Sequence, residues 1–200
     1  MVKISVLIVT RNAEKHILSC LKSIINQFPD NNGWELIIVD GMSKDKTRKI
    51  VEDYLKDKGV EYRVVDNPRF TLATGWNLGV SVAKGDYVVR PDAHAELLDN
   101  YILNGVAHLD KEPELVAVGG ILITKSENLI GEVIAAVLSN PVGIGYSLFR
   151  VGVSKDTYTD TAVYAVYRKP VFSQVGGLNE SLTRNQDIDF HRRILDDGHK

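Results

Sequence analysis

The sequence contains a single cysteine, Cys20, among 200 residues. One cysteine can form neither an internal disulfide nor a structural zinc site, which fits a protein of a reducing compartment. Cys20 falls on the apolar side of a predicted helix. We therefore expect a buried thiol and not a nucleophile.

Long hydrophobic runs are also missing. No stretch approaches the roughly 20 apolar residues that span a bilayer, and the longest candidate, "LIGEVIAAVL", contains Glu132. The opening "KISVLIVT" is too short for a signal peptide and has no small-residue cleavage site. We expect a cytoplasmic protein. Because "ILDDGHK" reads as the end of a helix, we also expect the chain to be truncated at its C-terminus.

Strong charge of one sign and phosphate-binding glycine motifs are absent too. The net charge is −2, and no basic patch is interleaved with aromatic residues, so nothing indicates nucleic-acid binding. No GxGxxG follows the first predicted strand, and no GxxxxGK[ST] occurs in the chain. These absences argue against a dinucleotide fold of that type and exclude a P-loop.

What is present is an alternation of strand and helix patterns. The apolar fraction of 44% supports a real core, and 200 residues suit one domain. Strands are predicted at 4–10, 34–40, 61–66 and 86–90. Helices are predicted from Asn12 as the N-cap to Phe28, over 43–59 with Gly59 as the C-cap, and over 71–85 ending at Gly85. This pattern predicts an α/β fold with a mostly parallel sheet and helices on both faces.

The second half predicts a smaller, mixed arrangement. Helices are expected over 95–109 and 128–140, and strand-like runs over 114–124 and 159–169. Residues 141–156 are Gly-rich and predict a mobile loop. A final helix is expected after Asn185 as its N-cap.

Polar residues follow each of the first four predicted strands. They are Thr10, Arg11 and Asn12, then Asp40, then Asp66 and Asn67, then Asp92 and His94. Because ligands bind at the carboxyl ends of strands in open α/β sheets, these residues predict a site at one edge. Pro91 favours extended backbone before it, so Asp92 and His94 can point the same way and hold a divalent cation. Asp92 can equally cap a following helix with His94 exposed, and the pair leaves both interpretations open.

The ordered set of segments carries a resemblance. "SVLIVTRN", "WELIIVDGMSKDKT", "WNLGVSVAKGDYVVR" and "PDAH" resemble the nucleotide-binding half of family-2 inverting glycosyltransferases, which have the GT-A fold. "NPVGIGYSLFR", "YRKPVFSQVGGLNE" and "RNQDIDFHRRI" resemble the succinoglycan-type enzymes that build exopolysaccharide. The resemblance implies one Rossmann-like domain, 1–200. Residues 1–110 would bind the nucleotide sugar and 111–200 the acceptor.

The resemblance also implies an activity and its residues. A hexose would pass with inversion from a UDP-sugar to an acceptor hydroxyl, such as that of a lipid-linked oligosaccharide at the inner face of the cytoplasmic membrane. Asp187 would be the general base, and Asp92 with His94 would hold Mn²⁺ or Mg²⁺. The nucleotide sugar would be bound by Thr10, Arg11, Asn12, Asp40, Arg69, Asn77 and Asp92. Two residues depart from the family pattern, since His94 and Gln186 stand where acidic residues are usual.

Each of these residues also has a simpler interpretation. Asp187 can serve only the dipole of its helix, and Asp40 can be a turn residue before Gly41. The whole chain can be a decayed nucleotide-sugar-binding module, or a sugar-phosphate nucleotidylyltransferase, although "TRNAEKH" lacks the glycines of the latter. The "VIAAVL" helix can make peripheral membrane contact, but we expect most of its residues to pack on the sheet.

Overall fold

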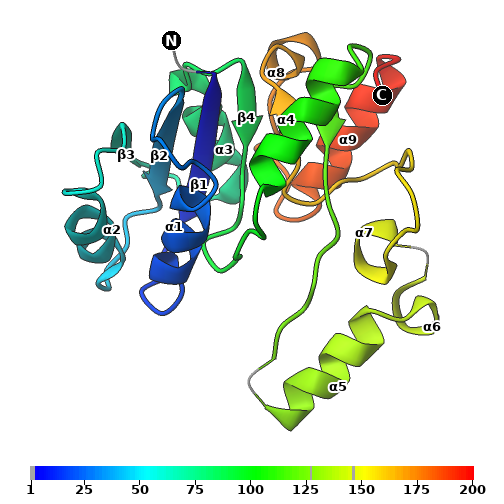
Figure 1. The fold of residues 1–200 in the computed structure, drawn as a ribbon, viewed down its shortest axis with the longest axis horizontal. Helices are drawn as coiled ribbons and strands as arrows, with labels where there is room; N and C mark the ends of the chain where they lie inside the picture. Colours follow the sequence, from blue (N-terminus) through cyan, green and yellow to red (C-terminus); the bar gives the residue numbers. More distant parts are fainter. Residues whose placement is uncertain (1–2, 127, 146) are drawn as a thin grey trace.

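The structure is a computed structural model that describes residues 3–126, 128–145 and 147–200. Within these residues the strands are β1 (Ile4–Thr10), β2 (Trp34–Asp40), β3 (Tyr62–Asp66), β4 (Tyr87–Val89), β5 (Ala117–Val118) and β6 (Val166–Arg168). They form one sheet in the order β3-β2-β1-β4-β6-β5 (Figure 1). The first four strands are mutually parallel, and β6 runs antiparallel to both β4 and β5. The predicted α/β, mostly parallel sheet is confirmed.

Helices cover both faces of this sheet. The helices are α1 (Ile17–Ile25), α2 (Thr47–Leu55), α3 (Leu72–Val82), α4 (Tyr101–Lys111), α5 (Leu129–Leu138), α6 (Pro141–Ile144), α7 (Leu148–Val151), α8 (Val171–Gln174) and α9 (Gln186–Asp196). Side chains alternate along β1, so that Val6 and Ile8 pack with α1, α2 and α4, whereas Leu7 packs with α3, α8 and α9. The result is a three-layer arrangement with two hydrophobic cores.

Continuous β-branched runs explain why β1 and β2 form at the predicted residues. Their side chains are buried almost throughout, as expected for strands covered on both sides. Cys20 is buried among them, and burial raises the pKa of its thiol to about 12. The expected burial of this thiol is confirmed.

A buried carboxylate ties three parallel strands together. Glu35 is fully buried on β2 and accepts hydrogen bonds from Ser5 Oγ at 2.7 Å and from the backbone N–H of Lys84 at 2.6 Å. Arg63 on β3 lies 2.8 Å from its other oxygen. Glu35 thereby fixes the entry to β4 relative to β1 and β3. Gly85 is required there because a Cβ would lie 2.7 Å from the Ser5 backbone nitrogen.

Several predicted helix boundaries are wrong. Asn12 does not cap α1, because it adopts φ +53 and its side chain accepts a hydrogen bond from the N–H of Lys44; the helix begins at Ile17. Helices α2 and α3 end at Leu55 and Val82, before the predicted stops at Gly59 and Gly85. Helix α4 starts at Tyr101 and not near residue 95, after Asn100 in the left-handed region.

The second half departs further from the predictions. The strand expected over 114–124 is reduced to β5, because the chain leaves the sheet at two glycines; a Cβ on Gly120 would lie 2.5 Å from the Tyr101 ring. The strand over 159–169 is reduced to β6. The predicted loop contains α6 and α7. Asn185 precedes α9 with φ 58 and makes no side-chain capping bond to the described residues.

Helix α5 projects away from the sheet (Figure 1). None of its ten residues, all of which the structure describes, is buried. The expectation that most of this helix packs on the sheet is therefore wrong. Across the described residues, every helix is too short or too polar to cross a membrane.

Candidate active site at the carboxyl edge of the sheet

The carboxyl ends of the parallel strands bring the predicted polar residues to one edge. Thr10 is aligned with Asp40 on the neighbouring strand, and Asp40 with Asp66 on the next. The connection from β3 to β4 crosses β1, so the strand order reverses beside β1. In open α/β sheets such a switch point forms a crevice that binds ligands. The predicted alignment of Thr10, Asp40 and Asp66 at one edge is confirmed.

Thr10 and Asp40 form the floor of this edge, and both are nearly inaccessible to solvent. The Asp40 carboxylate accepts a 2.6 Å hydrogen bond from Ser43 Oγ and bonds of 3.2–3.3 Å from the Ser43 N–H. The Thr10 hydroxyl has no hydrogen-bond partner among the described residues. Because a buried hydroxyl without a partner is costly, Thr10 is a ready contact for a bound polar group.

The two loops above the floor are joined by hydrogen bonds. Asn12 donates its N–H to Ser43 Oγ at 2.9 Å and accepts from the N–H of Lys44 at 2.8 Å. The N–H of Glu14 donates to Asp45 at 3.1 Å, and Glu14 accepts from the N–H of Lys46 at 2.9 Å. The loop after β1 and the loop after β2 therefore form one rigid wall.

Phe70 is a candidate site residue that the sequence did not reveal. Its side chain is 50% exposed, and its φ is +61, a conformation that bulky side chains rarely adopt. The guanidinium of Arg11 lies 4.7 Å from the centre of its ring. Strained, exposed aromatic residues cluster at binding sites, and only the conformation, which no sequence pattern shows, distinguishes this one.

Arg69 and Asn77 are engaged with the segment that precedes α9. Arg69 forms a 2.5 Å ion pair with Glu180, and the Asn77 amide donates to Glu180 and to the Leu178 carbonyl, both at 2.9 Å. The hydrogen bond from Asn77 is the main reason that the pKa of Glu180 is below its ordinary value, with Arg69 adding to the effect. The two residues thus hold the chain that leads to α9.

Asp92 and His94 lie together beyond β4. The His94 Nε2 is 4.0 Å from Asp92 Oδ2, and the two side chains are 67% and 29% exposed, respectively. A single cation held between these two atoms would contact both of them. An oxygen and an imidazole nitrogen suit Mn²⁺, so the pair fits a cation whose remaining positions go to other oxygens. Within the described ranges no group of three or more His, Cys, Asp or Glu side chains could hold a metal.

Both oxygens of Asp92 already have partners in the protein. Arg90 Nη1 is paired with Oδ1, and Tyr164 donates its hydroxyl to Oδ2 at 3.1 Å. The Arg90 guanidinium lies 5.0 Å from the centre of the Trp76 ring, and its Nε is buried without a partner among the described residues. Arg90 therefore places a buried positive charge directly beside the carboxylate. Nothing in the sequence distinguishes Arg90 from an ordinary residue at the end of a strand.

Aromatic packing connects Arg90 to α9. Trp76 packs edge-on against Tyr167, with ring centres 5.6 Å apart, and so belongs to the core as expected. Tyr167 Oη lies 2.7 Å from His191 Nε2, and His191 Nδ1 lies 3.1 Å from Thr161 Oγ1. Burial raises the pKa of the Tyr167 hydroxyl, which Arg90 opposes and Asp187 reinforces. The charge of Arg90, directly after β4, and that of Asp187 on α9 thus act on one hydroxyl.

Asp187 is exposed in the first turn of α9. One turn later on the same helix, His191 is buried, and burial lowers its pKa while Asp187 and Asp160 partly offset that effect. Asp189 is paired with Arg193 at 3.0 Å. In the first turn of α9, Asp187 is thus the exposed carboxylate, and Asp189 has a structural partner.

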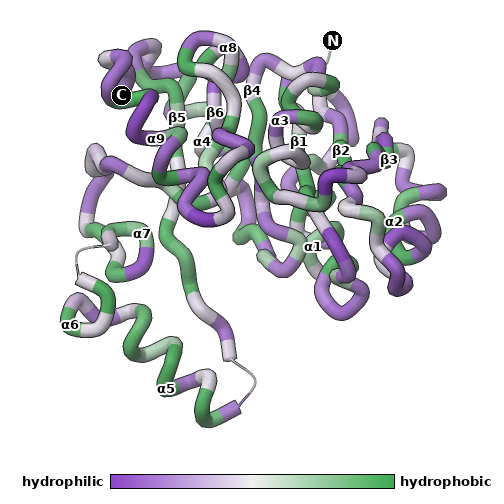
Figure 2. The backbone as a smooth tube through the Cα atoms, turned by 180° about the vertical axis from the view of Figure 1, so that it is seen from behind, coloured by the Kyte–Doolittle hydropathy of each residue, from purple (hydrophilic) through white to green (hydrophobic). Residues whose placement is uncertain are grey.

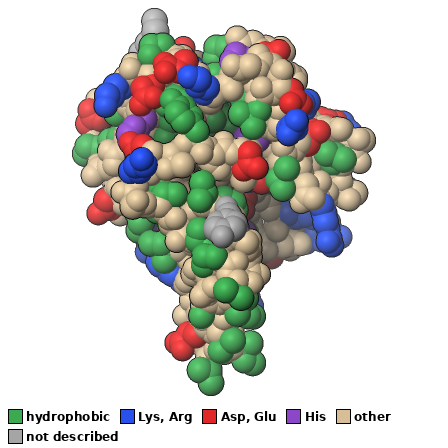
Figure 3. Space-filling view, turned by 90° about the vertical axis from the view of Figure 1, so that its right-hand side faces the viewer, with side chains coloured by type: hydrophobic (Ala, Val, Ile, Leu, Met, Phe, Trp, Pro, Cys, Tyr) green, Lys and Arg blue, Asp and Glu red, His purple; other side chains and the backbone are tan. Residues whose placement is uncertain are grey.

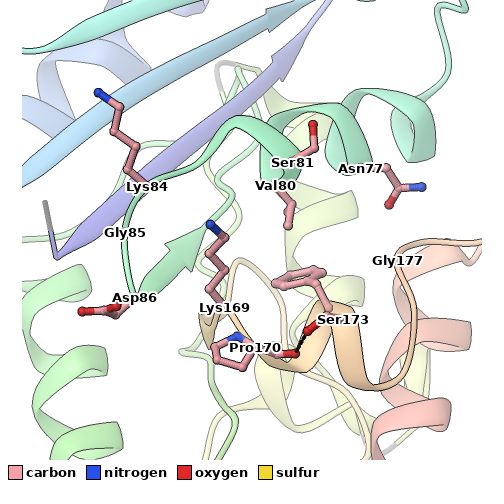
Figure 4. Close-up of a pocket in the computed structure, with 11 residues that line it drawn as sticks. Asn77, Val80, Ser81, Lys84, Gly85, Asp86, Lys169, Pro170, Ser173 and Gly177 are labelled. Carbon is pink, nitrogen blue, oxygen red and sulfur yellow. Dashed lines mark hydrogen bonds between the residues drawn. The ribbon is translucent and has the colours of Figure 1, made fainter.

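Two hollows lie next to this framework. A groove of about 630 Å³ runs between α4, α7, α9 and residues 156–162, and His191 lines it. A second hollow of about 550 Å³ lies between α3 and α8, beside Gly85 and Asp86 (Figure 4). The second is at the amino end of β4, opposite the predicted site, and its Lys84 is paired with Glu61 at 2.6 Å. The groove lined by His191 is thus the hollow that adjoins α9.

The family model described as "Glycosyl transferase family 2" matches residues 5–176. The chain belongs to this family. A dolichyl N-acetyl-α-D-glucosaminyl phosphate glucuronosyltransferase of Methanococcus voltae is 28% identical over 98% of this chain and 63% of its own length. The succinoglycan biosynthesis protein ExoA of Rhizobium meliloti is 25% identical over 94% of the chain and 57% of its own length. The chain therefore spans less than two thirds of these relatives.

Solved structures confirm the GT-A glycosyltransferase fold. The mannosyltransferase PcManGT of Pyrobaculum calidifontis, in complex with GDP-Man and Mn²⁺, superposes with a TM-score of 0.71 at 19% identity, over 94% of this chain and 50% of that one. S. aureus TarS 1–349 in complex with UDP-GlcNAc gives 0.70 at 21% identity, over 96% and 52%. The predicted resemblance to family-2 glycosyltransferases is confirmed.

Proposed function

We propose that this chain transfers a hexose, with inversion, from a UDP-sugar to a hydroxyl of a lipid-linked oligosaccharide in cell-surface glycan synthesis. The observation that carries the proposal is the arrangement at the carboxyl edge of the sheet. There the buried residues Thr10 and Asp40 lie side by side, and the Asp92–His94 pair follows β4. One relative is a transferase for a dolichyl phosphate-linked sugar, and another takes part in succinoglycan biosynthesis. Both support a lipid-linked oligosaccharide as the acceptor. Residues 1–110 would bind the donor and 111–200 the acceptor.

The floor and the joined loops would hold the uridine. The Thr10 hydroxyl supplies an unused polar contact. The Asp40 carboxylate would accept an N–H of the base once the hydrogen bond from Ser43 Oγ is broken. Arg11 and Phe70 offer a flat surface on which the base can stack. Asn12 holds the two loops together, and Arg69 and Asn77 hold the segment that leads to α9. These three residues would therefore position the binding site more than contact the nucleotide.

Negative charge develops on the leaving diphosphate. A bound Mn²⁺ or Mg²⁺ held by Asp92 and His94 would neutralise part of that charge. The Arg90 guanidinium, which is paired with Asp92, would also be able to donate hydrogen bonds to an oxygen of the leaving diphosphate. This chain's residues thus supply both a cation site and a fixed positive charge.

The acceptor hydroxyl must lose its proton as it attacks. We assign this step to Asp187, which is exposed at the start of α9 and adjoins the groove through His191. A positioned base contributes about 10²–10⁴-fold to the rate. His191, held between Tyr167 and Thr161, would keep the groove wall in place beneath the acceptor.

One observation favours a second candidate function. Both oxygens of Asp92 have internal partners, and Gln186 is buried and donates to the Leu182 carbonyl where the family usually has an acid. A nucleotide-sugar-binding module without catalysis would tolerate both features. Titration with UDP and Mn²⁺, followed by an assay of UDP release with and without lipid-linked acceptors, separates the two. Acceptor-dependent release supports the transferase, whereas binding without release on any acceptor supports the module.

We place the enzyme in the cytoplasm, at the inner face of the cytoplasmic membrane, because nucleotide sugars are made in the cytoplasm and the proposed acceptor is anchored in lipid. Fractionation of cells that express the chain tests this location. Recovery in the membrane fraction is expected, and recovery entirely outside it would contradict the proposal.

A further inference from the structure

Helix α5 and its neighbours form an exposed apolar projection, which we call the apolar arm (residues 121–126, 128–145 and 147–153). Along one face of α5 lie Leu129, Ile130, Val133, Ile134 and Val137, which are between 49% and 75% exposed. Val142 after the helix is 97% exposed. Figure 2 shows the helix as a hydrophobic stretch apart from the body, and Figure 3 shows apolar side chains at the tip of the projection.

The arm also lacks the charges that a solvent-facing helix usually carries. Between Asn128 and Phe149 the sequence has one charged residue, Glu132. The face of α5 opposite the large apolar side chains carries Gly131, Ala135 and Ala136 besides Glu132. An amphipathic helix in water buries its apolar stripe and exposes a charged face, and α5 does neither. We therefore expect this face to be covered by an apolar protein surface or by lipid.

Size and charge decide between a second protein copy and lipid. A stable dimer needs roughly 20–30 residues from each partner, more than the nine large apolar side chains that are exposed on the described part of the arm. The arm has no lysine or arginine within 128–149 to pair across an interface. A bilayer needs neither matching shape nor matching charge. Ten residues at about 1.5 Å each give a helix half as long as the hydrocarbon core, so α5 would lie in the boundary region without crossing.

We propose that the apolar arm docks this chain on a lipid bilayer, with the apolar face of α5 in the headgroup–acyl boundary. The proposal deepens the proposed function, on which it rests for a lipid-linked acceptor. The arm is continuous with the groove beside α9, because Ile121, Phe149 and Val153 line the same groove as His191. An acceptor whose lipid stays in the bilayer would therefore enter the groove from the base of the arm.

Vesicle flotation of the full chain tests the docking. With pure phosphatidylcholine vesicles, the wild-type chain should float, and raising the salt from about 0.1 to 1 M should not release it, because α5 has no cationic residues whose attraction to lipid salt could screen. The double variant Ile130→Glu, Ile134→Glu should lose at least about tenfold in partitioning. Leu18→Glu, at a 37% exposed position on α1, is the matched control and should float like the wild type.

Circular dichroism and UDP binding keep the result interpretable. Because both isoleucines are exposed, the double variant should keep wild-type helicity and UDP affinity. A wild-type chain that stays in the dense fraction, or a double variant that floats equally well, overturns the docking proposal. So does a wild-type dimer that the double variant converts to a monomer. Failure to float with intact sugar transfer to a soluble acceptor refutes only the docking, whereas flotation without any transfer refutes only the transferase.

Discussion

Replacing Arg90 with methionine should tighten the binding of Mn²⁺ at Asp92. In the structure the Arg90 guanidinium occupies Asp92 Oδ1, and its side chain is 11% exposed against 29% for Asp92. A hydrogen bond to a charged group contributes about 1.5–3 kcal/mol, and a cation bound by the same carboxylate would compete with it. Removing the competitor should therefore strengthen Mn²⁺ binding by roughly 10- to 150-fold. Methionine keeps an unbranched apolar stem against Trp76, which limits the loss of packing.

The affinity is measured without nucleotide, by electron paramagnetic resonance of free Mn²⁺ in a titration with the chain. Arg90→Lys should give an intermediate affinity, because it keeps the charge but loses the planar guanidinium. Arg69→Met is the control, since Arg69 pairs with Glu180 and should leave Mn²⁺ binding unchanged. Equal or weaker Mn²⁺ binding by Arg90→Met would refute the competition between arginine and cation for Asp92.

Three further variants test the fold and the donor site. Glu35→Ala should lower the free energy of unfolding by about 3–5 kcal/mol in urea, because it leaves Arg63 and buried donors without their partner; a loss under about 1 kcal/mol would contradict the role of Glu35. Phe70→Ala should weaken UDP binding by about 1–3 kcal/mol in calorimetry if the base stacks there, and unchanged affinity would exclude stacking. The folded-state pKa of His191 lies below the ordinary 6.5, so the unfolded chain binds the extra proton first and stability should fall as the pH drops below about 6.5. This pH dependence should be reduced in His191→Gln, and an identical pH profile would contradict it.

The predictions succeeded where local sequence determines structure. The runs "ISVLIVT" and "WELIIVD" became β1 and β2 at the predicted residues, because each is apolar and β-branched and lies buried in a covered sheet. The row of Thr10 and Asp40 follows from the same parallel order. The second half failed because its elements depend on distant partners. β5 ends where the chain meets Tyr101, and no periodicity within 114–124 reports that contact.

The same reasoning explains which site residues were missed. Arg90 stands out because it pairs with Asp92 and lies over the ring of Trp76. Glu180 stands out because Arg69 and Asn77 both bind it. Phe70 stands out by its backbone conformation. Each of these relations exists only in the folded chain. Motif spacing was enough to predict the carboxyl edge of the sheet as the site. The hydrogen-bond and ion-pair partners of each side chain there are determined only by the folded structure.

The most direct test of the central claim is the comparison of UDP binding and sugar transfer in Asp187→Asn. We predict UDP and Mn²⁺ affinities like those of the wild type, together with a loss of about 10²–10⁴-fold in acceptor-dependent UDP release. The substitution keeps the size of an exposed side chain, so the fold should be unaffected. Transfer at the wild-type rate would contradict the account and remove Asp187 from the reaction.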